Sequence, residues 1–476
     1  MEMIKPLSKI STLALAILTL LYLLTRTINI LSLPIFLDEA LYLRMTRDLL
    51  SFGQIWISFV DGKEPFFFWV NAIFLRILPN PLFAGRLLQV LAGLGTLLVL
   101  YHLTNYLFKR KVALVASLLY IFSPFFLLYN RLAILDNFLT FILIAYVYFL
   151  LRTIRERSKK YAVLCGTFLG LALITKSLAL MYLVAIPSAL LVFGNIFRMK
   201  RRDFLPILLI LAIAACLYFP LTQVPGFEAI AVKNATLTWP LKTAFSNLDS
   251  IFIINLKTVI RHWLPYLWGF VPMGLVALFS TLAVFRKNRE IIFLIALLVI
   301  PTLAGTLIGR IFFPRHLLFT TVPFLIILAW AIVHLADNIK SKLLAFAVVL
   351  CLLIQPGIST LSLAYWNKPN FLPEIEKWQL YYGWPSGNCL LLPVEKIEKL
   401  AATELIKVSI PPDGVAEVMK LSFYDSRAVT LLPDANAKVA DYQVFNYYQE
   451  DTALKPLTLD SKLCRQPPKI YELQKD

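Results

Sequence analysis

The sequence predicts a multi-pass α-helical membrane protein with about 11 transmembrane helices, followed by a small α/β domain outside the membrane. Of its 476 residues 59% are hydrophobic, and the mean hydropathy is +0.74. Soluble domains are only roughly 45–50% apolar. Apolar runs of about 20 residues, enough to cross a hydrocarbon core, recur along most of the chain. Towards the end the composition becomes mixed and rich in proline.

The predicted spans follow these runs in order. The first, at residues 10–29, follows Lys5 and Lys9 but has no small-x-small cleavage site after it, so we interpret it as an uncleaved anchor. The others are expected at residues 86–108, 112–129, 134–151, 161–175, 178–197, 204–223, 264–285, 291–309, 317–335 and 343–363.

The net charge of +18 is distributed unevenly along the chain. With the N-terminus in the cytoplasm, the short inner segments hold most of the excess: Lys5, Lys9, Lys109, Arg110, Lys111, Arg152, Arg155, Arg157, Lys159, Lys160, Arg198, Lys200, Arg201, Arg202, Arg286, Lys287, Arg289, Lys340 and Lys342. This positive-inside pattern predicts a plasma-membrane protein with a cytoplasmic N-terminus and an extracytoplasmic C-terminus. It also accounts for the charge without nucleic acid as a partner.

The first outer loop, residues 31–85, belongs to a transmembrane domain that we place at residues 1–365. Within this loop, residues 41–52 have the polar and apolar periodicity of an interfacial amphipathic helix, with Gly53 as its stop. A second helix is expected after Pro65 and is too short to span. Chemistry is therefore expected on the outer side.

Residues 366–476 are predicted to form the extracytoplasmic domain. The runs AVTLL and YQVFNYY look like strands, and residues 394–405 look like a helix. Cys389 and Cys464 lie in this domain, where an oxidising compartment permits a disulfide, although spacing does not establish one.

The adjacent carboxylates Asp38 and Glu39 lie where the first loop meets the membrane. One interpretation makes Asp38 the N-cap of the following helix, with Glu39 complementing the helix dipole. The other makes them catalytic, because a half-shielded carboxylate can serve as a base. Both interpretations can hold for the same residue.

Further charges converge on the outer side in this topology: Lys63, Glu64, Arg131, Asp136, Lys176, Arg310, Arg315 and His316. Basic groups near a helix start or with a guanidinium fork suit a phosphate. The alternative, non-functional interpretations of these charged residues are solvated turns, local ion pairs and interface anchors. No Walker loop, GxGxxG, GxSxG or HExxH motif occurs in the sequence.

Taken in order, the motifs DE (38–39), GKEP (62–65), R-x4-D (131–136), TKS (175–177) and PRH (314–316) resemble a family of GT-C class membrane glycosyltransferases. These are the dolichyl-phosphate-mannose protein mannosyltransferases and the bacterial aminoarabinose transferases of lipid A. The resemblance covers roughly residues 34–323. Glu64 stands where the family has proline, and His316 stands where it often has tyrosine.

The resemblance implies inverting transfer of a sugar from a polyprenyl-phosphate donor to an acceptor hydroxyl on the outer face, with a lipid, glycan or protein as acceptor. Asp38 and Glu39 would be catalytic. The donor phosphate would be bound by basic residues, namely Lys63, Arg131, Lys176, Arg310 and Arg315. Glu64, Asp136 and His316 would be orienting groups or ligands of a divalent metal, whose requirement is left open.

Other functions were weighed against this one. A lipid-linked glycan ligase or polymerase would leave the early DE pair unexplained. A lipid or sugar transporter would place ionisable residues near the midplane, often with inverted repeats, and no repeat is found in the sequence. A noncatalytic scaffold presenting the tail would be insensitive to Asp38→Asn.

Overall fold

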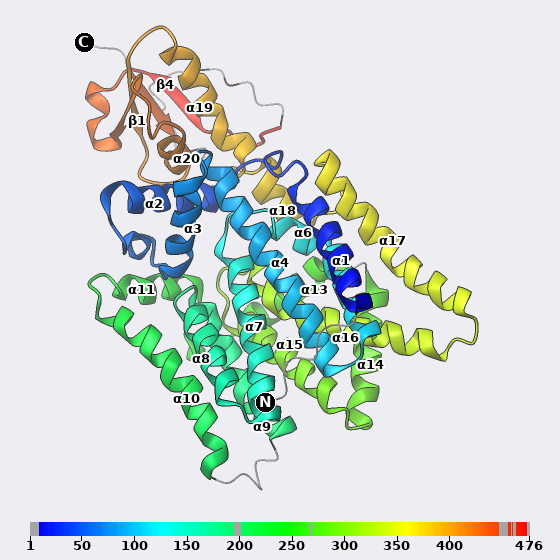
Figure 1. Cartoon of the computed structure of the whole chain (residues 1–476). Helices are drawn as coiled ribbons and strands as arrows, with labels where there is room; N and C mark the ends of the chain where they lie inside the picture. Colours follow the sequence, from blue (N-terminus) through cyan, green and yellow to red (C-terminus); the bar gives the residue numbers. More distant parts are fainter. Residues whose placement is uncertain are drawn as a thin grey trace.

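Apolar helices form one end of the molecule and a small sheet forms the other (Figure 1). The computed structural model describes residues 9–194, 201–266, 269–446, 456–457, 459 and 463–473. Lys5, Arg198 and Lys200 of the expected inner basic set lie outside these ranges.

The helices of the membrane end mostly follow the predicted runs, although those within residues 224–263 lie where no span is predicted. They are α1 (Lys9–Thr27), α4 (Pro81–Leu107), α5 (Arg110–Ile121), α6 (Pro124–Tyr129), α7 (Leu135–Glu156), α8 (Lys159–Leu173), α9 (Ala185–Phe193), α10 (Arg201–Tyr218), α11 (Glu228–Leu237), α12 (Leu241–Ser246), α13 (Ile253–Tyr266), α14 (Phe270–Phe285), α15 (Arg289–Ile308), α16 (Leu318–Asn338) and α17 (Lys342–Trp366).

Five helical segments in the described ranges are long and apolar enough to cross a membrane: Pro81–Leu107, Leu135–Glu156, Phe204–Gln223, Arg289–Ile308 and Pro314–Asn338. Shorter apolar helices accompany them, among them Thr12–Thr27 and Phe270–Phe285. The predicted class, a multi-pass helical membrane protein with a small α/β part, is confirmed.

Several predicted spans are not single α-helices. The run at 204–223 ends as a 3-10 helix (Phe219–Gln223) after α10. The run at 112–129 breaks between α5 and α6, because Ser123 caps a new helix that has Pro124 in its first turn. The run at 178–197 begins as a 3-10 helix (Ser177–Val184) and continues as α9, and residues 195–197 lie outside the described chain. The run at 264–285 spans the end of α13, residues 267–268 outside the described chain, and α14.

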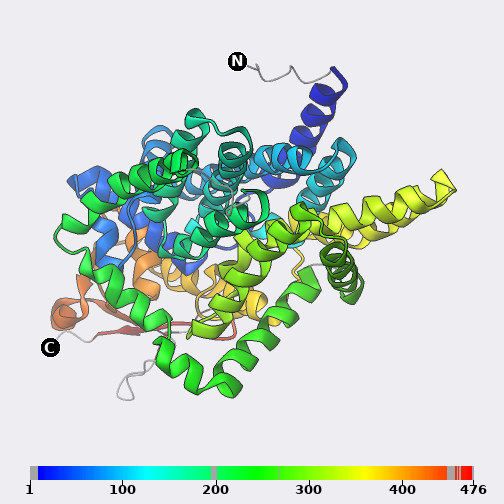
Figure 2. The same ribbon diagram turned by 90° about the horizontal axis from the view of Figure 1, so that it is seen from below.

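Helix packing places α7 between α4 and α8, while α16 contacts α5, α7 and α15. α16 is buried along most of its length. α10 packs against α8 at the edge of the bundle, and α17, drawn in yellow, extends from the side of it in the view from below (Figure 2). A single apolar core therefore holds the ends of these helices in fixed positions.

The first outer loop forms α2 (Leu37–Phe52), a 3-10 turn (Ile57–Asp61) and α3 (Phe66–Ile77). α2 begins earlier than predicted, and its cap position is Phe36, so the interpretation of Asp38 as the N-cap is wrong. Gly53, with φ of 66°, ends α2 as predicted.

The C-terminal part contains a four-stranded sheet in the order β2-β1-β3-β4. β1 (Ile406–Ile410) is parallel to β2 (Val429–Pro433) and β3 (Tyr442–Phe445), and β3 is antiparallel to β4 (Lys469–Glu472). The predicted strands correspond to β2 and β3, although the end of the second run, from residue 447, lies outside the described chain. The predicted helix at 394–405 is α19 (Gly387–Ala401), which begins earlier, and Cys389 is bonded to Cys464.

The sheet end packs on the first outer loop, with α2 and α3 between it and the spanning helices (Figure 1). Helix α20 (Val415–Ser422) contacts α2, and Ile35 and Ala40 pack in the same apolar core as α19, α20 and β1. Arg44 of α2 pairs with Glu417 of α20. Both ends of the molecule therefore meet where Asp38 lies.

Candidate active site

A cavity of about 650 Å³ lies between the loop of residues 31–85, the start of α7, the end of α15, α11 and the C-terminal part of the chain. Its polar wall contains most of the predicted site residues: Asp38, Lys63, Glu64, Asp136, Lys176, Arg315 and His316. Its apolar wall includes Met181, Leu237, Pro301 and Ile308. A cavity of this size can hold a small polar group and part of an apolar chain.

Asp38 and Arg315 form an ion pair in the cavity. Arg315 lies in the 3-10 turn Pro314–Leu317 and donates a hydrogen bond of 2.8 Å from Nη2 to Asp38 Oδ2. The rings of Phe36 and Phe313 lie 5.2 and 4.9 Å from its guanidinium carbon. The Asp38 side chain is 26% exposed, so it is reachable from the cavity while it is partly shielded.

Two further groups of paired lysine and aspartate side chains line the cavity. Lys176 Nζ donates to Asp136 Oδ1 at 2.7 Å. Asp61 accepts from Lys233 Nζ at 2.7 Å and lies 3.9 Å from Lys63 Nζ. The cavity therefore holds several ammonium groups whose partners leave donors free to bind an anion, because each ammonium has three donors.

Lys233 and Asp61 were not identified from the sequence. Lys233 lies on α11, between the predicted runs at 204–223 and 264–285, and no local motif connects it with residues 31–85. The contact depends on Gly62, which has a φ of 60° and would place a Cβ 2.5 Å from Lys233 Cβ and 2.6 Å from the Ala229 carbonyl. A glycine at this position lets α11 approach the loop. Gly62 of the GKEP motif is thus the sequence signal that indicates a segment packed closely against this turn, which in the structure is α11.

Burial changes the titration of two groups beside this turn. Burial lowers the pKa of Lys63, and the negative charge of Asp61 partly offsets this shift. Burial raises the pKa of Glu64, and the hydrogen bond that Ser177 donates partly offsets this shift. Both shifts follow from the cost of holding a charge away from water. Lys63 and Glu64 therefore lie in a part of the cavity that is largely shielded from water.

The expected orienting or metal-binding residues do not come together. Glu64 is bonded to Ser177, Asp136 to Lys176, and His316 Nδ1 lies 3.4 Å from the Phe313 amide. In the described part of the chain no three His, Cys, Asp or Glu side chains are grouped to hold a metal ion. Glu64, Asp136 and His316 thus line one cavity, but each is bonded to a partner of its own.

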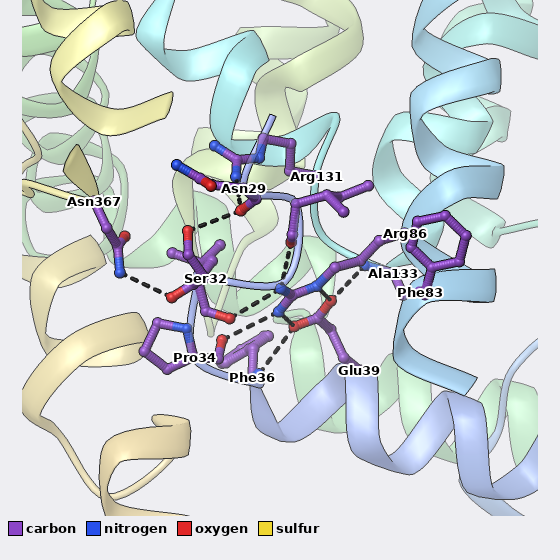
Figure 3. Close-up of polar contacts among 12 residues, drawn as sticks. Asn29, Ser32, Pro34, Phe36, Glu39, Phe83, Arg86, Arg131, Ala133 and Asn367 are labelled. Atoms are coloured by element: carbon purple, nitrogen blue, oxygen red, sulfur yellow. Dashed lines mark hydrogen bonds and ion pairs between the residues drawn. The ribbon is translucent and has the colours of Figure 1, made fainter. Parts of the chain in front are cut away.

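Glu39 lies outside the cavity lining and is fully buried against Arg86 (Figure 3). Arg86 donates to both of its carboxylate oxygens, at 2.9 and 2.8 Å. The amides of Phe36 and Ala133 also donate to this carboxylate, at 3.0 and 2.8 Å. Arg86 further binds the carbonyls of Ile30, Leu33 and Pro34. Glu39 thus fixes the segment that carries Asp38.

Arg131 and Arg310 also lie outside the cavity lining. Arg131 is buried and donates to the carbonyls of Ile28 and Asn29 (Figure 3). Arg310 is exposed, with its guanidinium 4.7 Å from the centre of the Trp239 ring. Neither position contacts the group of ammonium ions around Asp61 and Asp136.

Comparisons with known proteins give one family and several solved structures. Residues 62–222 match the family model of dolichyl-phosphate-mannose-protein mannosyltransferase. The fold is similar to ArnT from Cupriavidus metallidurans bound to undecaprenyl phosphate, with a TM-score of 0.61, 15% identity and coverage of 97% of each chain. The chain is thus similar in sequence to this mannosyltransferase family over residues 62–222 and similar in fold to ArnT over nearly its whole length.

The chain is also similar in fold to the apo oligosaccharyltransferase of Archaeoglobus fulgidus, with a TM-score of 0.60, 12% identity and coverage of 92% of this chain and 69% of the other. A second structure of that enzyme, AglB in complex with an inhibitory peptide and a dolichol-phosphate, matches with a TM-score of 0.57 and 13% identity. No match was found among curated protein sequences. The predicted resemblance is confirmed at the level of the class, and the family match includes the Lys63 and Asp136 motifs.

Proposed function

We propose that this glycosyltransferase moves a sugar from a polyprenyl-phosphate donor to an acceptor hydroxyl, with Asp38 as the general base. The observation that carries the proposal is the position of Asp38, which is partly exposed in a cavity lined on the same side by Arg315, Lys63 and Lys176. A base and a set of cations in one site suit a reaction that takes a proton from a nucleophile while a phosphate departs.

In this reaction the acceptor oxygen attacks the anomeric carbon as the bond from that carbon to the phosphate oxygen breaks. Asp38 takes the hydroxyl proton, and the polyprenyl phosphate leaves with the bonding electrons. A single displacement of this kind inverts the anomeric centre. The positioned base would contribute roughly 10²- to 10⁴-fold to the rate.

Arg315 is assigned to the donor phosphate together with three lysines, Lys63, Lys176 and Lys233. Arg315 reaches Asp38 with one terminal nitrogen, so the rest of its fork can meet the departing phosphate oxygen. Asp61 and Asp136 hold the lysines in place before the donor arrives. Such preorganised charge lowers the barrier because no reorganisation is needed during the reaction.

The donor is proposed to carry a lipid because the cavity continues into an apolar wall between the 3-10 turn Ser177–Val184 and α15. Met181, Leu237, Pro301 and Ile308 line this side. A soluble nucleotide sugar would not need it. The structural neighbours include proteins bound to undecaprenyl phosphate and dolichol-phosphate, which supports a polyprenyl carrier.

The remaining predicted site residues receive other roles in the proposal. Glu39 is a positioning residue, because its carboxylate binds Arg86 and two backbone amides instead of facing the cavity. Arg131 holds the end of the α1 segment. Arg310 anchors the loop at Trp239. His316 and Glu64 orient the cavity wall.

The positive-inside pattern supports an orientation in which this cavity and the C-terminal domain, residues 366–476, face the outside of the plasma membrane. Residues 1–365 are proposed as the membrane domain that holds the catalytic groups. The acceptor, a lipid, glycan or protein, would then be modified on the outer face.

The test is a transfer assay with purified protein in lipid, radiolabelled polyprenyl-phosphate sugars and a membrane extract as the source of acceptor. Wild type is compared with Asp38→Asn and with Asp48→Asn, a control on the same helix whose carboxylate pairs with Arg44. We expect Asp38→Asn to lose at least 100-fold while Asp48→Asn stays near wild type. Full activity of folded Asp38→Asn would exclude Asp38 as the base, and movement of the lipid-linked sugar across the bilayer without transfer would indicate a transporter.

A further inference from the structure

A second cavity lies at the opposite end of the membrane helices from the catalytic one. It has a volume of about 390 Å³ and is lined by the end of α7, the start of α8, the end of α9 and the start of α10. Helix α7 connects the two cavities, because Asp136 at its start lines the first and Thr153 near its end lines the second. The rise of an α-helix separates these two residues by about 25 Å.

The inner part of this second cavity is apolar. Leu190 and Ile207 form its buried floor, and Phe193 lies on its wall. The Phe193 ring is held in place by Arg155, whose guanidinium carbon lies 4.2 Å from the ring centre and whose Nη2 donates to Glu290. Arg155, which does not itself line the cavity, therefore fixes the position of a wall residue, and the floor suits hydrocarbon.

The outer rim of the cavity is cationic. Arg157 and Lys159 line it, and both side chains are exposed. The stretch that carries both residues is strongly basic in sequence, namely RTIRERSKK at 152–160. A rim of this charge attracts an anion.

The surface beside the cavity faces lipid and not water. Leu205, which lines the cavity, is 56% exposed, and its neighbours on the outside, Leu191 and Leu208, are 68% and 60% exposed. Large apolar side chains that are exposed at this density on a membrane helix contact hydrocarbon. The cavity is thus open both to hydrocarbon and to the basic membrane surface.

We infer that this cavity is a binding site for an anionic glycerophospholipid of the membrane leaflet opposite the active site. The phosphate would lie at Arg157 and Lys159, and the upper part of one acyl chain would enter between Leu190, Phe193 and Ile207. Basic pockets between membrane helices on the cytoplasmic side are suited to anionic head groups. A glycerophospholipid fits better than the donor lipid, whose phosphate is needed about 25 Å away.

The site would lie among four helices, of which α8 already packs against α7 and α10, and α9 against α7. The proposed lipid site is independent of the transfer reaction proposed above, because none of its residues lines the catalytic cavity. Its test can therefore succeed or fail independently of the transfer reaction.

The experiment is a titration of the purified, delipidated full-length protein with phosphatidylglycerol, with phosphatidylcholine as the zwitterionic comparison, read by native mass spectrometry. The wild type is compared with Arg157→Gln/Lys159→Gln and with the control Arg286→Gln/Arg289→Gln. The control removes exposed charges from the same face that do not line the cavity. We expect the cavity variant to bind phosphatidylglycerol at least 10-fold more weakly and the control to stay within about 3-fold of wild type.

A second pair of variants tests whether the lipid enters the cavity or only lies on a basic surface. Leu205→Trp narrows the cavity, whereas Leu208→Trp adds the same bulk on the neighbouring exposed surface. We expect weaker phosphatidylglycerol binding for Leu205→Trp alone. Equal effects of the two charge variants, equal binding of the two lipids, or unaltered binding by Leu205→Trp would each overturn the site. Preferential retention of a polyprenyl phosphate over phosphatidylglycerol would also overturn it, in favour of a second site for the carrier.

Discussion

Arg315 lies 277 residues after Asp38 in the chain, yet its Nη2 donates a hydrogen bond of 2.8 Å to Asp38 Oδ2. The pair joins the first outer loop to the turn before α16. It also holds the proposed base next to the proposed phosphate ligand before any substrate binds. The geometry at the centre of the cavity is therefore set by the contact between two distant parts of the chain.

Arg315→Lys should lower the transfer rate by roughly 10²- to 10³-fold, because a lysine keeps the charge but loses the planar fork that can reach Asp38 and a phosphate together. Arg310→Lys is the matched control, since Arg310 is exposed against Trp239 outside the cavity lining. It should stay within about 2-fold of wild type. Steady-state rates at saturating donor check both. Equal losses in the two variants would contradict the assignment of Arg315.

Glu39→Gln should destabilise the protein by about 3–5 kcal/mol, because it leaves the charge of Arg86 buried without its partner. The control Glu290→Gln removes a half-exposed partner of Arg155 and should cost no more than about 1 kcal/mol. Thermal unfolding in detergent measures both. Glu39→Gln protein that remains folded should retain more activity than Asp38→Asn, and the reverse order would make Glu39 the catalytic carboxylate.

Glu376 should make stability depend on pH. Burial raises its pKa from 4.5 to about 7, partly offset by the hydrogen bond from Tyr129 Oη at 2.6 Å. The folded protein then binds more protons than the unfolded chain between these values, so stability falls as pH rises from about 4.5 to about 7. The loss would reach about 3 kcal/mol. Glu376→Gln should abolish this dependence, and an identical slope in the variant would assign it to another group.

Transfer should not require a divalent metal, because Lys176 already supplies the positive charge beside Asp136. We expect EDTA to change the wild-type rate by less than about 2-fold, whereas Lys176→Gln should lower it by at least about 10-fold. A loss of activity in EDTA that magnesium, manganese or zinc restores would show that the site gathers a metal when substrate binds.

Some of the site was accessible from the sequence because its signals are local. The GKEP motif, Asp38 and the basic residue of PRH all lie at helix ends after apolar runs, and chain direction alone puts such ends on one side of a membrane. All three line the cavity. Glu39 and Arg131 have the same local signals but face elsewhere. Glu39 accepts from the Phe36 amide and Arg131 donates to the Ile28 carbonyl, both in the connection between α1 and α2. Sequence position does not show the direction of a side chain.

By itself, the sequence determined the membrane class, the positions of most spans, the strands of AVTLL and YQVF, and the GT-C resemblance. Hydropathy and charge patterns are read from contiguous residues, so they identify an apolar helix whichever part of the fold it packs against. Only the tertiary structure decided that Lys233 joins Asp61, that Glu39 binds Arg86, and that α20 closes the cavity over α2. These outcomes depend on which distant segments meet, and no local pattern encodes such a contact when the partner comes from elsewhere in the chain.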